Sequence, residues 1–413
     1  MFRTLPIGPS RHLVRFLELD GSVFALKEEP LDVAEREFAV LRHLEAASLP
    51  AVSAVGLAIS PERDAAILAT EYLTYSIQYR RLLMRFPLGP GPYRERLLDA
   101  MAWLLVDLHR SGVYWGDCSL ANTLFRRDGD KIQAFLVDAE TSEIHPFLSD
   151  GQRAHDLEIL VENVAFGLAD LAALQGRPDG IDEAIELAEN VRSRYAALWD
   201  EIHAAPELSP DDRHAIRARI RAMNDLGFAV DEISLEPMPG GSGSVRLRVA
   251  VANRRFHVRK LERLTGIVAL EGQARLLLND LEEYRAWIEY HEARQLADQV
   301  AAERWLHEVL EPALASLVPA IGPLRDPLQA YCDVLEEKWI LSEMAGGDVG
   351  LEAAKEAYIA LGAPSPESVD EPADSSIILD IDWSTGFDDV PDGPEPEAGP
   401  PVQGSRPSAT IGP

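Results

Sequence analysis

Cysteine is scarce in this chain: Cys118 and Cys332 are the two among 413 residues, and they lie far apart. A disulfide framework or a cysteine-rich metal cluster needs more thiols, so a reducing compartment is expected. No stretch approaches the roughly 20 apolar residues of a membrane span, and the first residues lack the apolar run of a signal peptide. The sequence therefore predicts a cytoplasmic protein without transmembrane segments.

Basic residues are also in the minority, with 39 Lys and Arg against 69 Asp and Glu, which gives a formal net charge of -30. This charge repels nucleic acid and anionic lipid surfaces at long range, so no nucleic-acid partner is expected. Hydrophobic residues make up 46% of the chain. At this length they suffice for a sizeable core divided among two or three domains.

Residues 1–225 have the pattern of a small strand-rich region followed by a larger helical one. Two runs rich in Val, Leu and Phe flank Asp20-Gly21, a dipeptide typical of hairpin turns. The next segment predicts a helix with an apolar stripe of Ala34, Phe38, Leu41 and Leu44. Residues 65–73 indicate a buried strand leading into a connector, and a long amphipathic helix ends near Gly112.

The character of the chain changes near residue 226. Strands are expected at 228–236 and 245–251, with a short one near 256–258, followed by helices, so 226–362 is predicted to form a smaller, mainly helical α+β domain. Residues 363–413 contain 11 acidic residues and one Arg among many Pro, Ser and Gly, which predicts a disordered acidic tail. Its apolar segment 377–383 is either a docking motif or part of a solubilising tail.

The segment around Gly116-Asp117 carries the strongest functional signal. Asn122 follows Asp117 by five residues, and Asp138 ends a strand after a turn at Asp128-Gly129. An Asp can accept the proton of an attacking hydroxyl, whereas an Asn and a second Asp supply hard oxygen ligands for Mg²⁺ on nucleotide phosphates. Asp and Asn are also common turn formers, but this order of elements favours a phosphoryl-transfer site.

Lys27, near the end of the second predicted strand, is the candidate cation for nucleotide phosphates. This role needs a carboxylate on the following helix, and Glu35 and Glu37 are the two candidates. If Asp32 caps the helix, Glu35 has a structural position in a capping box. Glu37, at the edge of the apolar stripe, is therefore preferred as the partner of Lys27.

Other candidates have equally good structural interpretations. The turn at 7–11 contains one glycine, Gly8, and is either a phosphate-covering turn or an ordinary surface turn. The backbone of Glu71 and Leu73 either binds an adenine edge or simply ends a strand. Asp156 either favours a helix start or braces the loop that carries Asp117. The basic cluster 254–260 either binds a phosphate or the acidic tail, or is a solvated flank of a hairpin.

Together, Lys27, Glu37, Asp117, Asn122 and Asp138 resemble the protein-kinase-like superfamily, in particular lipopolysaccharide kinases, RIO-type kinases and small-molecule phosphotransferases. Segments 114–125 and 137–141 are also similar to a bacterial lipopolysaccharide-kinase-like family. That family carries a C-terminal domain of unknown function, which is similar to residues 226–350, including Gln273-Ala274-Arg275 and Trp339-Ile340-Leu341-Ser342-Glu343.

The resemblance implies a two-lobed protein-kinase-like fold and an ATP- and Mg²⁺-dependent phosphotransferase. It assigns catalysis to Asp117 with Lys27 and Glu37, metal binding to Asn122 and Asp138, and support of the loop to Asp156. It places nucleotide contacts at Gly8, Lys27, Glu71, Leu73 and Asn122.

The sequence departs from the family pattern at several positions. Trp115 replaces the His usually found two residues before the catalytic Asp, and Ala139-Glu140 replaces Phe-Gly after the metal Asp. Only 17 residues separate Asp138 from Asp156, which favours a small-molecule, glycan or lipid-linked hydroxyl acceptor over a peptide. The alternative is a pseudokinase-like scaffold or nucleotide-sensing interaction protein whose second domain or tail binds a protein partner. Transfer of AMP would use the same residues.

Overall fold

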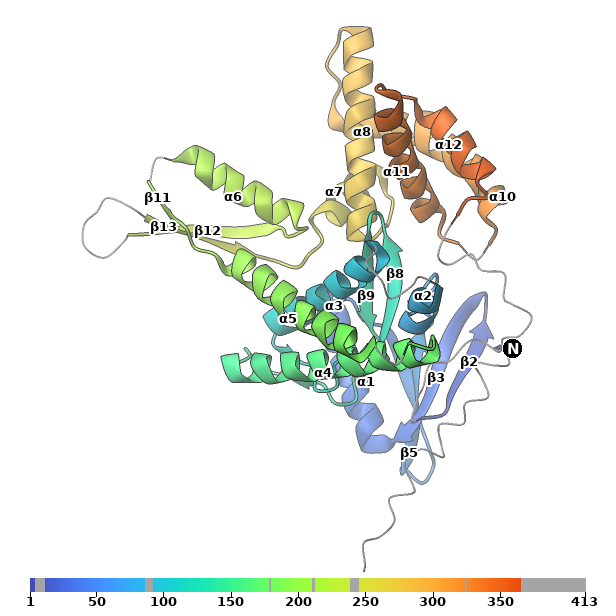
Figure 1. Cartoon of the computed structure of the whole chain (residues 1–413), viewed down its shortest axis with the longest axis vertical. Coiled ribbons are helices and arrows are strands. Elements are labelled where there is room, and N and C mark those ends of the chain that lie inside the picture. Colours follow the sequence, from blue (N-terminus) through green and yellow to red (C-terminus); the bar gives the residue numbers. More distant parts are fainter. Residues whose placement is uncertain are drawn as a thin grey trace, which may run out of the picture. The chain divides into compact units, whose positions relative to one another are not determined.

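An antiparallel sheet of five strands, in the order β1-β2-β3-β5-β4, forms the first part of the fold (Figure 1). Its strands are β1 (Phe2–Arg3), β2 (Val14–Leu19), β3 (Ser22–Pro30), β4 (Ala54–Ile59) and β5 (Ala65–Glu71). Asp20 and Gly21 have φ values of 50° and 81°, as a two-residue hairpin turn between β2 and β3 requires. The predicted hairpin is therefore confirmed.

The computed structural model describes residues 1–3, 12–85, 92–177, 180–209, 212–237, 245–323 and 325–364. Gly8 and nearly all of the acidic tail lie outside these residues. Among the helices of these ranges, none combines the length and apolar character needed to cross a bilayer.

Helix α1 (Leu31–Ala46) packs against this sheet and buries Ala34, Val40, Leu41 and Leu44. The predicted apolar stripe is confirmed, apart from Phe38, which is half-buried. The predicted cap is wrong, because β3 runs directly into Pro30, which occupies the N-cap position without a side-chain hydrogen bond. Asp32 lies inside the first turn and Glu35 is exposed.

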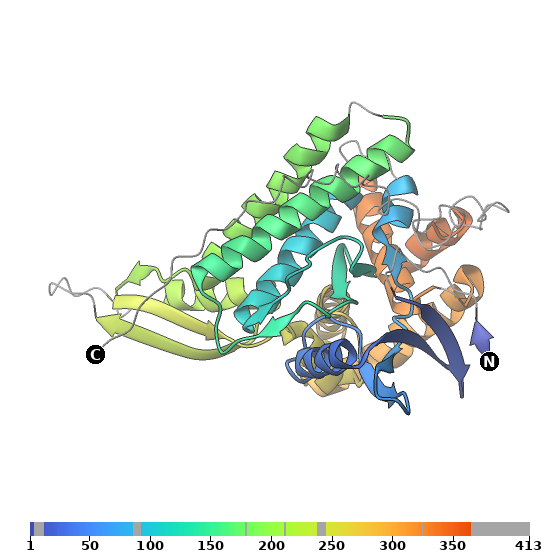
Figure 2. The same ribbon diagram turned by 90° about the horizontal axis from the view of Figure 1, so that it is seen from below.

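A helical region surrounds α3 (Pro92–Arg110), whose apolar residues Leu97, Leu98, Met101, Leu104, Leu105 and Leu108 are fully buried. Figure 2 shows α4 (Asp150–Leu174) and α5 (Ile181–His203) running beside it. Short elements complete this part: α2 (Tyr79–Arg85), α6 (Arg213–Asp225), β6 (Ile77–Gln78), β7 (Val113–Tyr114), β8 (Thr123–Asp128), β9 (Lys131–Leu136) and β10 (Glu143–Ile144). The two-part, protein-kinase-like architecture expected of this region is observed.

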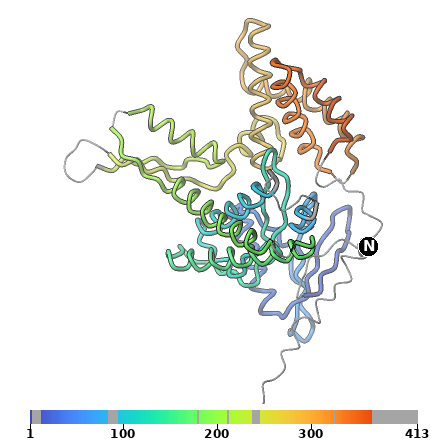
Figure 3. The backbone as a smooth tube through the Cα atoms, in the orientation of Figure 1, coloured from blue at the N-terminus to red at the C-terminus, as the bar shows by residue number. Residues whose placement is uncertain are grey.

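A second antiparallel sheet orders its strands as β11-β13-β12, with β12 and β13 forming an elongated ribbon (Figure 3). The strands are β11 (Glu207–Leu208), β12 (Val230–Pro237) and β13 (Val245–Val251). This sheet joins residues on both sides of the predicted boundary at 225/226, and that boundary stays a prediction.

The remaining helices enclose a hydrophobic core of their own. They are α7 (Phe256–Thr265), α8 (Glu271–Glu292), α9 (Asp298–Trp305), a π-helical turn η2 (Leu306–Leu310), α10 (Glu311–Ile321), α11 (Pro327–Ala345) and α12 (Leu351–Ala360). The strand expected near 256–258 is wrong, because these residues begin α7. The carboxylate of Glu271 accepts the backbone N–H groups of His257 and Val258 at 3.0 and 3.2 Å, which stabilises a helix start at this position.

Candidate active site

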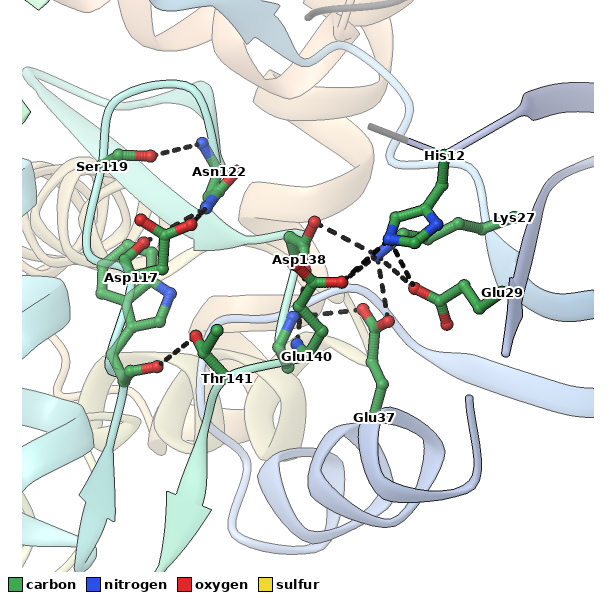
Figure 4. A network of polar contacts seen from close by, with 12 residues as sticks. His12, Lys27, Glu29, Glu37, Asp117, Ser119, Asn122, Asp138, Glu140 and Thr141 are labelled. Atoms are coloured by element: carbon green, nitrogen blue, oxygen red, sulfur yellow. Dashed lines mark hydrogen bonds and ion pairs between the residues drawn. The ribbon is translucent and has the colours of Figure 1, made fainter. Parts of the chain in front are cut away.

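The ammonium group of Lys27 on β3 lies among several carboxylates (Figure 4). Its Nζ is 3.1 Å from Glu37 Oε2, 3.1 Å from Asp138 Oδ2 and 2.6 Å from Glu29 Oε1. Glu37 comes from α1, Asp138 follows β9, and Glu29 shares β3 with the lysine. The structure thus brings Lys27, Glu37 and Asp138 together, as the sequence predicted.

The charge of Lys27 is firmly held. Burial lowers the pKa of this lysine, but the attraction of Glu37, Asp138 and Glu29 outweighs burial, and the pKa rises above its usual value. The ammonium group therefore stays protonated throughout the neutral range.

Glu37 connects α1 to both sides of the site. Its Oε2 contacts Lys27, and its Oε1 accepts the backbone N–H of Ala139 at 3.1 Å. Burial raises the pKa of Glu37 to about 8, while the charge of Lys27 opposes this shift and those of Asp138 and Glu29 add to it. Glu35, the other candidate, is exposed, so Glu37 is the carboxylate that meets the lysine.

The loop from Asp117 to Asn122 is held by its own hydrogen bonds. The Nδ2 of Asn122 donates to Oδ2 and to the backbone oxygen of Asp117, at 3.0 and 3.2 Å. The backbone N–H of Val137 donates to the backbone oxygen of Asn122 at 3.1 Å. Because Val137 precedes Asp138, this bond places the loop beside the end of the strand that carries Asp138.

Gly116 begins the loop in a conformation that favours glycine, with φ of 82°. A Cβ at this position would lie 2.8 Å from the backbone oxygen of Thr141. The hydroxyl of Thr141 also donates to the backbone oxygen of Trp115 at 2.9 Å. The loop and the segment after Asp138 are therefore in direct contact, and a larger residue at 116 would separate them.

Asp156 lies beneath the loop and is fully buried. Its carboxylate accepts the backbone N–H groups of Trp115 and Gly116, each at 2.8 Å, and the Nε2–H of His109 at 3.0 Å. Burial alone would raise the pKa of Asp156, but the hydrogen bond from His109 and those from the two amides outweigh it and lower the pKa. Helix α4 starts at Asp150, so Asp156 lies beyond its first turn, and its contacts favour the bracing interpretation.

The predicted adenine contacts are at the end of β5. Glu71 is the last residue of β5 and is exposed, whereas Leu73 packs against the core. The N–H of Tyr72, between them, donates to the backbone oxygen of Val23 at 2.9 Å. Their nucleotide contacts, like that of Gly8, remain predictions.

Sequence reasoning missed three members of the polar cluster: His12, Glu29 and Glu140. The Nε2 of His12 is 3.0 Å from Glu140 Oε2 and 3.9 Å from Glu29 Oε1. A signal for two of them was available, because Glu29 lies two residues after Lys27 on the same face of a strand, and Glu140 two residues after Asp138. Four carboxylates thus surround one lysine, which makes the site attractive to cations.

Comparison with known proteins places this geometry in a family. Residues 26–176 match the sequence model of the Lipopolysaccharide kinase (Kdo/WaaP) family, and residues 197–361 match that of a domain of unknown function, DUF4032. The chain thus joins a Kdo/WaaP-family domain to a DUF4032 domain. The predicted resemblance and kinase-like fold class are confirmed. Lys27, Glu37, Asp117, Asn122, Asp138 and Asp156 lie inside the first match, and Gly8 precedes it.

A solved structure described as WaaP in complex with acyl carrier protein is similar to this chain at 21% identity. The similarity covers 48% of this chain and 88% of that one, with a TM-score of 0.32. Among curated proteins the comparison found no significant match. Membership of the Kdo/WaaP kinase family implies the use of a nucleotide, usually with a metal ion.

Proposed function

We propose that the chain is a phosphotransferase that uses ATP and Mg²⁺ to phosphorylate a hydroxyl acceptor. The observation that supports this most directly is the convergence of Glu37 and Asp138 on the ammonium of Lys27, each at 3.1 Å. The match to a kinase family supports the same reaction class.

In this proposal the ammonium of Lys27 binds phosphate oxygens, and Glu37 holds it in position. The acceptor oxygen attacks the γ-phosphorus, the bond from that phosphorus to the bridging oxygen breaks, and ADP leaves. Asp117, oriented by the Nδ2 of Asn122 at 3.0 Å, receives the proton of the hydroxyl.

The donor atoms of Asn122 and Asp138 fit Mg²⁺. The amide nitrogen of Asn122 faces Asp117, which leaves its oxygen for a cation, and the side chain of Asp138 is 23% exposed. Both offer the hard oxygen ligands that Mg²⁺ prefers. Bound at this position, Mg²⁺ supplies positive charge to the phosphate oxygens, and the surplus of carboxylates favours its binding.

The segment after Asp138 supports a non-peptide acceptor. Only 17 residues separate Asp138 from Asp156. Within them β10 pairs with β7, and the side chain of Ser149 caps α4. Little chain is left to dock a peptide, so we propose a small molecule, a glycan or a lipid-linked alcohol as acceptor.

Single-turnover assays with γ-labelled ATP, Mg²⁺ and a mixture of metabolites test this proposal. We expect Asp117→Ala and Asp138→Ala to lower label transfer or hydrolysis by a factor of about 100 or more. Asp32→Ala is the matched control, because this aspartate is 79% exposed on α1, and it should leave the rate unchanged. Rates that are equal in all four proteins would refute the proposal.

The same proteins separate the proposal from the scaffold or nucleotide-sensing alternative. That alternative predicts thermal stabilisation by Mg-ATP that Lys27→Ala abolishes, together with no transfer or hydrolysis in the wild type. Transfer of label from α-labelled ATP would instead show transfer of AMP.

A further inference from the structure

A cavity of about 620 Å³ lies apart from the Lys27 cluster. Its walls are the end of α1 with the segment leading to β4 (45–53), the end of α3 with β9, and two segments of the DUF4032 match, 251–259 and 269–271. None of Lys27, Glu37, Asp117, Asn122 or Asp138 lines it. Its volume is in the range of small-molecule sites.

The acidic residues of the cavity wall already have partners. Asp107 Oδ2 is 3.3 Å from Arg254 Nε, and Glu271 Oε1 is 2.7 Å from His257 Nδ1. Glu45 forms an ion pair with Arg42. The carboxylates of the wall are therefore occupied by positive charge or, for Glu271, by the imidazole and amides at the start of α7.

Two arginines of the wall have no such partner. Within the described ranges, neither Arg255 nor Arg259 forms an ion pair, and Arg255 makes a single long hydrogen bond, from Nη1 to Ser48 Oγ at 3.4 Å. Both belong to the basic cluster 254–260. In a chain of net charge -30, two guanidinium groups without acidic partners beside one cavity indicate an anionic ligand.

Buried polar atoms in the wall point in the same direction. The Oδ1 of Asn253 and the Nε of Arg254 have no hydrogen-bond partner among the described residues, and both residues line the cavity. The rest of the Arg254 guanidinium is fixed, because its Nη2 donates to Gln133 Oε1 at 2.6 Å. A ligand with both hydrogen-bond donors and acceptors would satisfy such atoms.

We propose that this cavity binds a small organic phosphate, at a site separate from the nucleotide site. The phosphate group contacts Arg255 and Arg259, and a hydroxyl group of the ligand donates to Asn253 Oδ1. This site does not depend on the proposed phosphotransferase activity. It also resolves the alternatives for cluster 254–260 in favour of phosphate binding.

Calorimetric titration of the full-length protein with inorganic pyrophosphate, without nucleotide or divalent metal, tests the site. We expect the wild type to bind, and Arg255→Ala/Arg259→Ala to bind about 100-fold more weakly, because a charge-assisted hydrogen bond contributes about tenfold. Arg263→Ala is the matched control, since Arg263 is exposed on the same helix outside the cavity wall, and it should bind as the wild type does.

Two further variants separate the cavity from other anion sites. Lys27→Ala should keep pyrophosphate binding, because that lysine does not line the cavity. Ala252→Trp fills the cavity without a change of charge and should abolish binding. Absence of binding to the wild type at millimolar pyrophosphate, equal weakening by Arg263→Ala, loss with Lys27→Ala, or normal binding to a folded Ala252→Trp would each overturn the proposal. If Ala252→Trp does not fold, the arginine variants decide the question.

Discussion

Lys27 stabilises the buried carboxylates around it as well as being a candidate ligand for phosphate. The side chains of Glu29 and Glu37 are 0% and 1% exposed, and Lys27 is the lysine that faces both. Neither oxygen of Glu29 has a hydrogen bond within the described part of the chain, so its ion pair with Lys27, at 2.6 Å, is its main stabilising contact. A buried carboxylate without a cation is strongly unfavourable.

Replacing the lysine tests this dependence. We expect Lys27→Met to lower the free energy of unfolding by about 3 kcal/mol, as the removal of one partner from a buried ion pair does. Adding Glu29→Gln should restore about 1 kcal/mol or more, because the second change removes an unpaired charge. Urea denaturation of the wild type, the single variant and the double variant at pH 7 measures both effects. Additive losses in the double variant would contradict this account.

Glu37 gives the cluster a pH dependence with a definite sign. Its pKa rises from the ordinary value of 4.5 to about 8 on folding, so the folded protein holds this proton more tightly than the unfolded chain does. Its contribution to stability is therefore complete below pH 4.5 and is lost as the pH rises through about 8. Glu37→Gln, which keeps the shape but does not titrate, should remove this loss.

We expect the stability of Glu37→Gln relative to wild type to increase by about 2 kcal/mol between pH 5 and pH 9, since one unit of pKa shift corresponds to about 1.36 kcal/mol. Urea midpoints at both pH values measure the difference. Glu35→Gln, at an exposed position of the same helix, is the control and should follow the wild type. A parallel pH profile for Glu37→Gln would show that Glu37 is ionised on folding.

At the scale of elements, α4 and the loop at 115–122 act as one unit through Asp156. The neutral imidazole of His109 supports this unit from α3, since burial lowers the pKa of His109 and its Nδ1 lies 2.7 Å from the hydroxyl of Tyr195 on α5. Three helices therefore position the two amides that precede Asp117.

We expect Asp156→Asn to release these amides, because the variant loses the charge and one of the two accepting oxygens. A hydrogen bond to a charged group contributes about 1.5–3 kcal/mol, so the amides of Trp115 and Gly116 should exchange hydrogen at least about tenfold faster. Hydrogen exchange measured by NMR or mass spectrometry detects the change. Asp150→Asn, at a 97% exposed position of the same helix, should leave both amides protected, and unchanged exchange in Asp156→Asn would contradict the bracing role.

The elements also show which features the sequence can reveal. The β2–β3 hairpin and α1 were predictable because Asp20-Gly21 and a regular apolar stripe are local signals. The choice of Glu37 over Glu35 followed from the same stripe. The start of α7 was not predictable, because Glu271, which accepts its first amides, lies 13 residues beyond Val258. Glu29 and Glu140 were missed because their proximity to Lys27 and His12 depends on strand pairing and on the path after β9.

At the scale of the whole molecule, the turn between β8 and β9 joins the kinase-like region to the DUF4032 region. Asp128 Oδ1 accepts the N–H of Gln273 at the start of α8, at 2.8 Å. Gly272 fits because a Cβ there would lie 2.2 Å from the backbone oxygen of Asp128. Strands β8 and β9 connect Asn122 to Asp138, so the DUF4032 region fixes the hairpin between the two proposed metal ligands. No local pattern announces this contact, because its partners are more than 140 residues apart.

The strongest test of this connection is the ion pair between Arg127 on β8 and Asp333 on α11. Two nearly parallel bonds, of 2.7 and 2.6 Å, join them, and both side chains are less than 10% exposed. Arg127→Ala leaves Asp333 buried without its main cation and should lower the free energy of unfolding by about 3–5 kcal/mol. Arg275→Ala, which removes the more exposed pair with Asp130 at the same turn, should cost less than about 1 kcal/mol.

The same variants show whether the two regions unfold together. Because the hairpin lies in both the kinase-like fold and the contact with α8 and α11, calorimetry of the wild type and of Arg275→Ala should give one cooperative transition. Arg127→Ala weakens the contact selectively, so its transition should broaden or divide in two. Arg127→Met/Asp333→Leu, which replaces the pair by apolar residues, should restore a single transition, as replacement of buried ion pairs often does. Two transitions in the wild type would mean that the DUF4032 region is a separate folding unit and does not support the Asn122–Asp138 hairpin.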